Sequence, residues 1–346
     1  MKITVQPTDV CTSKCVVVDV LRNNLNSMYD ERRFEWLYER NPHGQPRAWL
    51  AIDEMQDRPI GVAAAFPRSV YCDDKENTAW VLGDFCLEPQ YRSLGPALQL
   101  QRACLAVMQG GKVDTFCYDF PSASMIAVYK RLGFNVIGKM FRLAKPLRVD
   151  RKSKAMIKNP AVQRVVTSVG NSLLKLTLPK VDVDESLEIS TYEGLCGEEF
   201  TAFALEQRRN YGICVQRSAE YLNWRYLNNP LAPHELVTAR RDGHLLGYAV
   251  LTETEEDMAI VDLFGEEKVE SVKSLVTNIM ALACKRDQMT LSVTINESHP
   301  WLSLFVKLGF RLRESIPVVI IPSKAFPHKI DSQLTGWYLV QGDRDS

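Results

Sequence analysis

The pattern of hydrophobic and polar positions alternates along the chain between a strand period and a helix period. Apolar runs predict an antiparallel hairpin over residues 47–71, turning at residues 56–59, and a second over residues 234–252, turning at Asp242-Gly243. Apolar residues spaced three and four apart predict a helix over residues 270–286. Strands mixed with helices in this way indicate an α/β protein with a mixed sheet covered on both faces.

The sequence also repeats internally. Residues 36–42 and 224–230 share Trp, Tyr, Asn and Pro in register, and Leu-Gly-Phe recurs at residues 132–134 and 308–310. The offset between the two copies shrinks after Gly61, and we expect a longer hairpin loop at residues 72–77 to account for most of this change. We expect Trp36 and its repeat to pack between helix and sheet.

The repeat predicts two domains of similar architecture joined by a linker. Each half reads as a short strand, two helices, a hairpin, a third strand, a helix, a strand, a helix and closing strands. We place the first domain at residues 1–147, a basic linker at 148–181 and the second domain at 182–346. A chain of 346 residues is long enough for both.

The linker differs in character from both domains. Residues 142–180 carry ten Lys or Arg against one acidic residue, and residues 160–176 are predicted to form one amphipathic helix. One interpretation is a solvated linker helix packed across the two domains. The other is a basic patch that holds an anionic substrate, a phosphopantetheine carrier or a membrane surface.

Composition limits the classes of partner. Lys plus Arg and Asp plus Glu both number 42, so no overall field attracts nucleic acid, and we expect no nucleic-acid partner. Apolar runs are too short to span a bilayer, so no membrane insertion is expected. Nine cysteines without a Cys-x-x-Cys pair favour the cytoplasm, and five scattered histidines predict no metal site. The oligomeric state stays open.

The most informative segment runs from Asp84 to Phe134. A strand over residues 84–89 leads into a glycine-containing turn at residues 92–97, and a helix follows over residues 98–108. The first amides of a helix lack intrahelical partners and lie at the positive end of its dipole, so such a turn suits phosphate oxygens. A second helix, over residues 122–132, carries Tyr129 and ends at Gly133.

Strand, Arg-x-x-Gly-x-Ala turn, helix, strand and a helix with Tyr-x-x-Leu-Gly-Phe resemble the GNAT superfamily of acyl-CoA-dependent N-acyltransferases. The resemblance implies two tandem GNAT-like domains, each a mostly antiparallel mixed sheet flanked by helices, and acetyl-CoA as co-substrate without a metal. It also implies a set of residues that bind the donor through backbone groups, charge or a hydroxyl: Cys86, Leu87, Arg92, Ser93, Leu94, Gly95, Ala97, Leu98 and Ser122. Pro96 occupies a variable position of the family's turn, but proline has no backbone N–H, so one possible phosphate donor is lost.

Acyl transfer to an amine needs a poised amine, donors for the oxyanion and a proton for the leaving thiolate. Tyr129 is the candidate acid, with a buried structural tyrosine as the alternative. Asp84 and Glu88, four apart on one strand, are candidate bases. Asp119 is a candidate acceptor contact or a helix cap. The acceptor is expected to be a small-molecule amine or an amino sugar.

The second half has lost these features. Residues 264–270 contain three glutamates where a pyrophosphate would lie, and Phe305 stands at the position of Tyr129. We therefore expect only the first half to bind the donor. Two other interpretations remain: a non-catalytic CoA-binding sensor or scaffold, and an aminoacyl-tRNA-dependent transferase of the peptidoglycan-bridge type.

Overall fold

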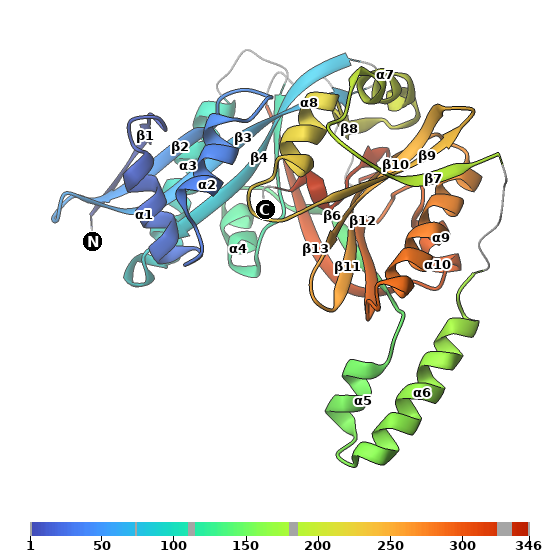
Figure 1. Cartoon of the computed structure of the whole chain (residues 1–346). Coiled ribbons are helices and arrows are strands. Elements are labelled where there is room, and N and C mark those ends of the chain that lie inside the picture. The colour runs from blue at the N-terminus through green and yellow to red at the C-terminus, as the bar shows by residue number, and fades with distance from the viewer. Residues whose placement is uncertain (1, 73–74, 110–114, 180–185, 324–333, 345–346) are drawn as a thin grey trace.

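The computed structural model describes residues 2–72, 75–109, 115–179, 186–323 and 334–344 (Figure 1). The strands are β1 Ile3–Thr8, β2 Arg47–Asp53, β3 Arg58–Cys72, β4 Lys75–Leu87, β5 Thr115–Asp119, β6 Val136–Pro146, β7 Glu188–Tyr192, β8 Ile213–Val215, β9 Glu235–Arg241, β10 His244–Glu253, β11 Asp257–Gly265, β12 Thr290–Asn296, β13 Arg311–Pro322 and β14 Trp337–Tyr338.

The α-helices are α1 Lys14–Asn24, α2 Glu31–Phe34, α3 Leu94–Gln109, α4 Ala123–Arg131, α5 Asp150–Met156, α6 Pro160–Leu176, α7 Glu198–Gln207, α8 Ala219–Leu222, α9 Val269–Lys285 and α10 Leu302–Lys307. Two short helices, α2 and α8, continue directly into π-helical turns at Glu35–Glu39 and Asn223–Leu227. Shorter 3₁₀ turns lie at Pro89–Tyr91, Arg208–Asn210 and Gln341–Asp343. Both predicted hairpins are present, as β2–β3 and β9–β10.

The two halves share one continuous sheet. Its order is β1-β2-β3-β4-β5-β13-β6-β12-β11-β10-β9-β7, mostly antiparallel, with β8 and β14 attached beside β3. The mixed sheet flanked by helices confirms the predicted fold class. One feature was not predicted: β13 of the second half pairs with β5 of the first, and β6 of the first half pairs with β12 of the second. The halves therefore exchange strands.

The expected long loop at residues 72–77 is wrong, because Cys72 and Lys75 are already paired. The extra residues lengthen the strands instead: β3 and β4 have 15 and 13 residues, against 10 and 9 in β10 and β11. The end of β3, Val70 to Cys72, pairs with β8 of the second half. The added length therefore joins the halves.

Helices cover both faces of the sheet in the first half. Val17 and Leu21 of α1 are buried against one face. On the other face, Leu100 of α3 and Tyr129 of α4 belong to a separate apolar cluster. As predicted, α4 ends at a glycine in the left-handed region, since Gly133 has φ 88°.

The linker forms a helical hairpin, α5 and α6, that projects from the body of the protein (Figure 1). Helix α6 has the predicted bounds, but none of its residues is buried. The interpretation of a helix packed across the two domains is therefore wrong. Within the described part of the chain, no helix is long and apolar enough to cross a membrane.

Candidate active site

A split in the sheet between β4 and β5 forms the candidate site. The two strands pair in parallel only from Thr78 to Val81 on β4 and from Thr115 to Tyr118 on β5. Beyond these residues β4 continues to Leu87 without β5 beside it, while the other edge of β5 pairs with β13. The exposed edge of β4 thus faces a gap bounded by α3 and α4.

A bulge in β4 sits at this split. Val62 pairs with Cys86 and Ala64 with Gly83, so Asp84 and Phe85 together oppose the single residue Ala63. Asp84 has a φ of 46°, in the left-handed region. A bulge takes one residue out of the ladder and redirects its side chain.

The outer part of the split is a cavity of about 570 Å³, which we call the donor pocket. It brings together seven of the nine predicted donor-binding residues, while Gly95 and Leu98 lie outside its lining. Its walls are formed by Asn24, Phe85, Cys86, Leu87, Arg92, Ser93, Leu94, Ala97, Ser122, Ser124, Met125, Ala127 and Val128.

Fewer amides are free at the start of α3 than predicted. The Ser93 amide donates to the Tyr91 carbonyl at 2.7 Å, and the Ala97 amide donates to the Ser93 carbonyl at 3.2 Å. Leu98 lies a full turn inside the helix, where its amide is placed to bond within the helix. Among the described contacts, the amides of Leu94 and Gly95 remain without a partner. The predicted phosphate donors therefore narrow to these two amides and the helix dipole.

Neither the space around Gly95 nor its backbone conformation requires a glycine in the fold itself. Gly95 lies in the first turn of α3, outside the left-handed region, which corrects the expected tight turn. A Cβ built on it meets no atom within 4 Å. The backbone here is open to the close approach of a ligand.

Arg92 has a structural task as well as a charge. Its Nε donates to the Leu87 carbonyl at 2.9 Å, and its Nη2 donates to the Asn24 carbonyl at 2.8 Å. These bonds tie the end of β4 to the end of α1. Arg92 is also one of the residues that line the donor pocket.

Ser122 and Cys86 contribute in restricted ways. Ser122 caps α4, accepting from the Met125 amide at 3.4 Å, and lines the donor pocket. Burial raises the pKa of the Cys86 thiol to about 12, so the thiol stays protonated and unreactive at neutral pH. Only the backbone of Cys86 is available to a pantetheine arm.

Deeper in the split lies a second cavity of about 370 Å³, which we call the inner cavity. It shares Phe85, Ser122 and Met125 with the donor pocket, so the two are adjoining. Asp84, Asp119 and Tyr129 all line it.

Tyr129 is held by two partners in the inner cavity. Its hydroxyl donates to Asp119 Oδ2 at 2.5 Å and accepts from Gln101 Nε2 at 3.2 Å. Burial, with the Asp119 charge beside it, raises the pKa of Tyr129 well above its usual value. Asp119 therefore lines the cavity, where it accepts a hydrogen bond from the Tyr129 hydroxyl, and Ser122 is the residue that caps α4.

Asp84 accepts hydrogen bonds from two buried tyrosines. Tyr29 and Tyr38 donate to its Oδ2 at 2.8 and 2.9 Å, and Arg33 lies 3.7 Å from Oδ1. Burial raises the pKa of both phenols, with the Asp84 charge as the second cause. These contacts were not predicted. The repeat pairs Tyr38 with Tyr226 and Asp84 with Asp262, but it could not show that the tyrosine and the aspartate of each half are in contact.

Glu88 is removed from the candidate bases. It pairs with Arg58, whose Nη2 donates to Oε2 at 2.8 Å, and it accepts from Gln90 at 3.0 Å. It does not line the inner cavity. The prediction that Asp84 and Glu88 share a face assumed a regular strand, and the bulge breaks that alternation.

Residues 18–134 match the model of the acetyltransferase (GNAT) family. The chain contains a GNAT acetyltransferase domain. This match confirms the resemblance to the GNAT superfamily and the expectation of an enzyme, and it supports an acyl-CoA thioester as co-substrate. No curated protein matches the chain.

Solved structures share the fold over nearly the whole chain. A probable N-acyltransferase from Enterococcus faecalis is 14% identical with a TM-score of 0.69, covering 94% of this chain and 74% of its own. A GCN5-related N-acetyltransferase from Anabaena variabilis is 12% identical with a TM-score of 0.64, covering 92% and 72%. N-myristoyltransferase from Saccharomyces cerevisiae, with bound myristoyl-CoA, is 11% identical with a TM-score of 0.57, covering 97% and 85%.

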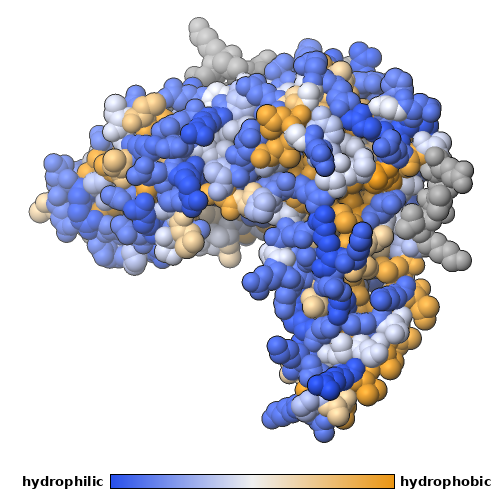
Figure 2. All heavy atoms as spheres, in the orientation of Figure 1, coloured by the Kyte–Doolittle hydropathy of each residue, from blue (hydrophilic) through white to orange (hydrophobic). Residues whose placement is uncertain are grey.

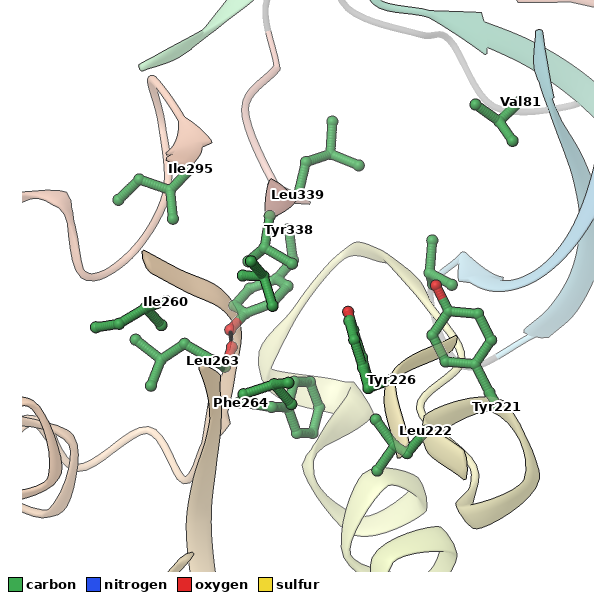
Figure 3. Packing of buried hydrophobic residues seen from close by; sticks show 14 of the residues in the cluster. Val81, Tyr221, Leu222, Tyr226, Ile260, Leu263, Phe264, Ile295, Tyr338 and Leu339 are labelled. Carbon is green, nitrogen blue, oxygen red and sulfur yellow. Dashed lines mark hydrogen bonds between the residues drawn. The ribbon is translucent and has the colours of Figure 1, made fainter. Parts of the chain in front are cut away.

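The equivalent split of the second GNAT-like half is filled by the chain itself. Strands β11 and β12 pair in parallel only as far as Ile260 and Val293. Beyond them, Tyr338 of the C-terminal segment lies against β11 and donates to the Leu263 carbonyl (Figure 3). Val340 bridges to Ile295 of β12. The gap that is open in the first half is therefore occupied here.

Aromatic rings complete this filling. Tyr338 packs against Tyr211, Phe264 and Trp301, with ring centroids 4.3, 5.7 and 5.8 Å away. Phe305, the counterpart of Tyr129, is fully buried. The second half therefore has packed aromatic rings beside the split, and a phenyl ring at the position of the Tyr129 phenol.

Trp36 and Trp224 meet across the boundary of the halves, a contact that the expected packing between helix and sheet did not include. The indole N–H of each donates to the backbone carbonyl of the other at 2.8 Å, and the rings lie 5.4 Å apart. Both are nearly buried. The repeated motif is therefore a reciprocal contact between the two halves.

Among the residues that the structure describes, no group of three or more His, Cys, Asp or Glu side chains is placed to hold a metal ion.

Proposed function

We propose that the first half transfers an acetyl group from acetyl-CoA to a primary amine of a small molecule or an amino sugar. The observation that carries the proposal is the adjoining pair of cavities in the β4–β5 split. The outer cavity has the lining expected for the donor, and the inner cavity has titratable groups where an acyl carbonyl would arrive. The division of the chain into domains at residues 1–147 and 182–346 stays a prediction.

The donor would lie along the open edge of β4. Strand-like contacts from the backbone of Cys86 and Leu87 suit a pantetheine arm. The amides of Leu94 and Gly95, with Arg92 beside them, would meet the pyrophosphate. An N–H released from the ladder by the bulge at Asp84 is a candidate donor to the oxyanion.

Tyr129 is the proposed acid for the leaving thiolate. Its raised pKa keeps the phenol protonated at neutral pH, and Asp119 and Gln101 fix its position. During the reaction the hydroxyl would exchange its bond to Asp119 for one to the sulfur. The amine would lose its proton to Asp84 or Asp119, directly or through water.

The test is a thermal-shift titration of the whole chain with acetyl-CoA, followed by mass spectrometry of a panel of amines. Acetyl-CoA should raise the melting temperature, and at about 100 times Kd the stabilisation should reach about 2.7 kcal/mol. At least one amine should gain an acetyl group, with consumption of acetyl-CoA and release of free CoA. The absence of any shift at millimolar acetyl-CoA would rule the proposal out.

One observation favours a second candidate, a CoA-binding sensor. Only two amides at the start of α3 are free for phosphate, since Pro96 has none and those of Ser93 and Ala97 are engaged. A sensor would show the thermal shift without acetylating any amine. The aminoacyl-tRNA alternative would show neither result with acetyl-CoA.

A further inference from the structure

The helical hairpin α5–α6 turns a polar face inward. Ser153 Oγ lies 2.5 Å from Thr167 Oγ1, and Asn171 donates to Asp150 at 2.8 Å. The Val149 amide also donates to Asn171, at 2.8 Å. The face of α6 that packs on α5 is therefore held by hydrogen bonds between small polar side chains.

The opposite face of α6 is apolar and exposed. The exposed fractions of its residues are 50% for Val162, 64% for Val165, 42% for Val166, 54% for Val169, 59% for Leu173 and 82% for Leu176. We call these six residues the apolar stripe. Figure 2 shows apolar side chains running along the outer side of the projecting hairpin.

This arrangement is the reverse of an ordinary surface helix, which turns its apolar stripe to the core. Within the stripe, residues 162, 166, 169, 173 and 176 follow spacings of four and three, so they lie on one side of the helix. A contiguous exposed patch of this kind marks an interaction surface.

The charge of the hairpin distinguishes between two possible partners of the apolar stripe, a lipid surface and a second copy of the chain. Residues 148–179 carry seven basic residues and one acidic residue, a net charge of +6, in a chain whose charges balance. Arg148 and Arg151 pair with acids at the base of the hairpin. The other five form no ion pair within the described part of the chain: Lys152, Lys154, Lys158, Arg164 and Lys175.

We propose that the hairpin docks the protein on an anionic lipid surface, with the apolar stripe of α6 in the boundary between headgroups and acyl chains. An amphipathic helix too short and polar to span a bilayer lies in this boundary, and basic residues draw it to anionic lipids. A second copy would instead bring +6 against +6, and this repulsion disfavours self-association through the same face.

The experiment is sedimentation of the whole chain with vesicles. The two compositions are phosphatidylcholine alone and phosphatidylcholine with about 30% phosphatidylglycerol, at ~0.1 M salt. Because each basic residue near an anionic surface strengthens binding about fivefold, we expect at least roughly tenfold tighter binding to the anionic vesicles. Raising the salt to ~0.5 M should weaken it.

The double variant Val165→Asp/Val169→Asp should reduce this binding at least about tenfold without changing the melting temperature, because both side chains are exposed. Met55→Asp/Leu195→Asp is the matched control, since these residues are exposed at 86% and 58% outside the hairpin, and it should bind as the wild type does. Equal binding to both compositions, or full binding by the stripe variant, would overturn the proposal. So would concentration-dependent dimers in sedimentation velocity that the stripe variant abolishes.

Discussion

Replacing Gly95 with aspartate is expected to separate donor binding from folding. Gly95 lies in the first turn of α3, and a Cβ there meets no atom within 4 Å. The new carboxylate would therefore fit without a clash. It would stand where the donor's pyrophosphate is proposed to approach.

The two effects of this change have opposite signs. An acidic side chain near a helix N-terminus stabilises the fold by about 0.3–1 kcal/mol, and replacing glycine in a helix adds a similar amount. Repulsion between unit charges ~4 Å apart costs about 1 kcal/mol in water and about 4 kcal/mol near a protein surface. Since ~1.4 kcal/mol changes Kd tenfold, the Kd for acetyl-CoA should rise by roughly 5-fold to 700-fold.

The assay is thermal denaturation with and without acetyl-CoA, with Gly95→Asn as the neutral control of matching size. Without acetyl-CoA, Gly95→Asp should melt at or above the wild-type temperature. With acetyl-CoA, it should lose most of the rise in melting temperature that the wild type shows. Gly95→Asn should keep most of the shift. Equal losses in the two variants would refute the electrostatic argument, and a full shift in Gly95→Asp would move the pyrophosphate away from α3. A change at Arg92 would be a poorer test, because the loss of its bonds to two backbone carbonyls would affect folding as well as binding.

Tyr129→Phe should keep donor affinity and lower kcat by roughly 10²-fold, and unchanged turnover would remove Tyr129 from the mechanism. Because the pKa of Tyr129 is raised, its contribution to stability is complete below pH ~10, the pKa of the unfolded phenol, and is lost as the pH rises above that value. Since the phenol does not ionise below pH ~10, no limb of the kcat profile in that range should disappear in Tyr129→Phe. Trp36→Phe and Trp224→Phe should each cost about 1–3 kcal/mol in urea unfolding, with non-additive effects in the double variant because the rings touch. Glu88→Gln should leave kcat within about twofold and lower stability by no more than ~1 kcal/mol, since its ion pair is partly exposed; a large fall in kcat would restore Glu88 as a base.

Much of the local structure was predictable because it is encoded within short segments. The two hairpins, the turn at Asp242-Gly243, the bounds of α6 and the glycine stop after α4 all follow from neighbouring residues, although the first hairpin turns at residues 54–57 and not at 56–59. The exchange of β6 and β13 was not predictable. Either strand would satisfy the same apolar pattern beside its own half or the other, and nothing local to residues 136–146 distinguishes the two pairings.

The candidate site, too, was predictable only in part. The order of motifs brought most of the donor-binding residues to one pocket. What sequence reasoning missed depends on backbone detail: the bulge that separates Asp84 from Glu88, and the carbonyls that occupy Arg92. Such partners are set by tertiary packing, which no residue spacing reveals.

The repeat offers an internal control for assigning roles. Tyr38 donates to Asp84 at 2.9 Å in the first half, and Tyr226 donates to Asp262 at 2.8 Å in the second, whose split is filled. A contact kept in both halves belongs to the scaffold, whereas Tyr129 with Asp119 belongs to the open half alone.

Asp84→Asn should therefore act mainly on stability. It weakens two buried hydrogen bonds, for a cost of about 1–3 kcal/mol. Asp262→Asn should cost more, about 3–5 kcal/mol, because Arg217 is fully buried beside it at 3.1 Å. Urea unfolding measures both, and kcat of Asp84→Asn at a temperature well below its melting point measures the chemistry. If Asp84→Asn lost its turnover while keeping wild-type stability, Asp84 would be the base, and a contact shared by both halves would not indicate a purely structural role.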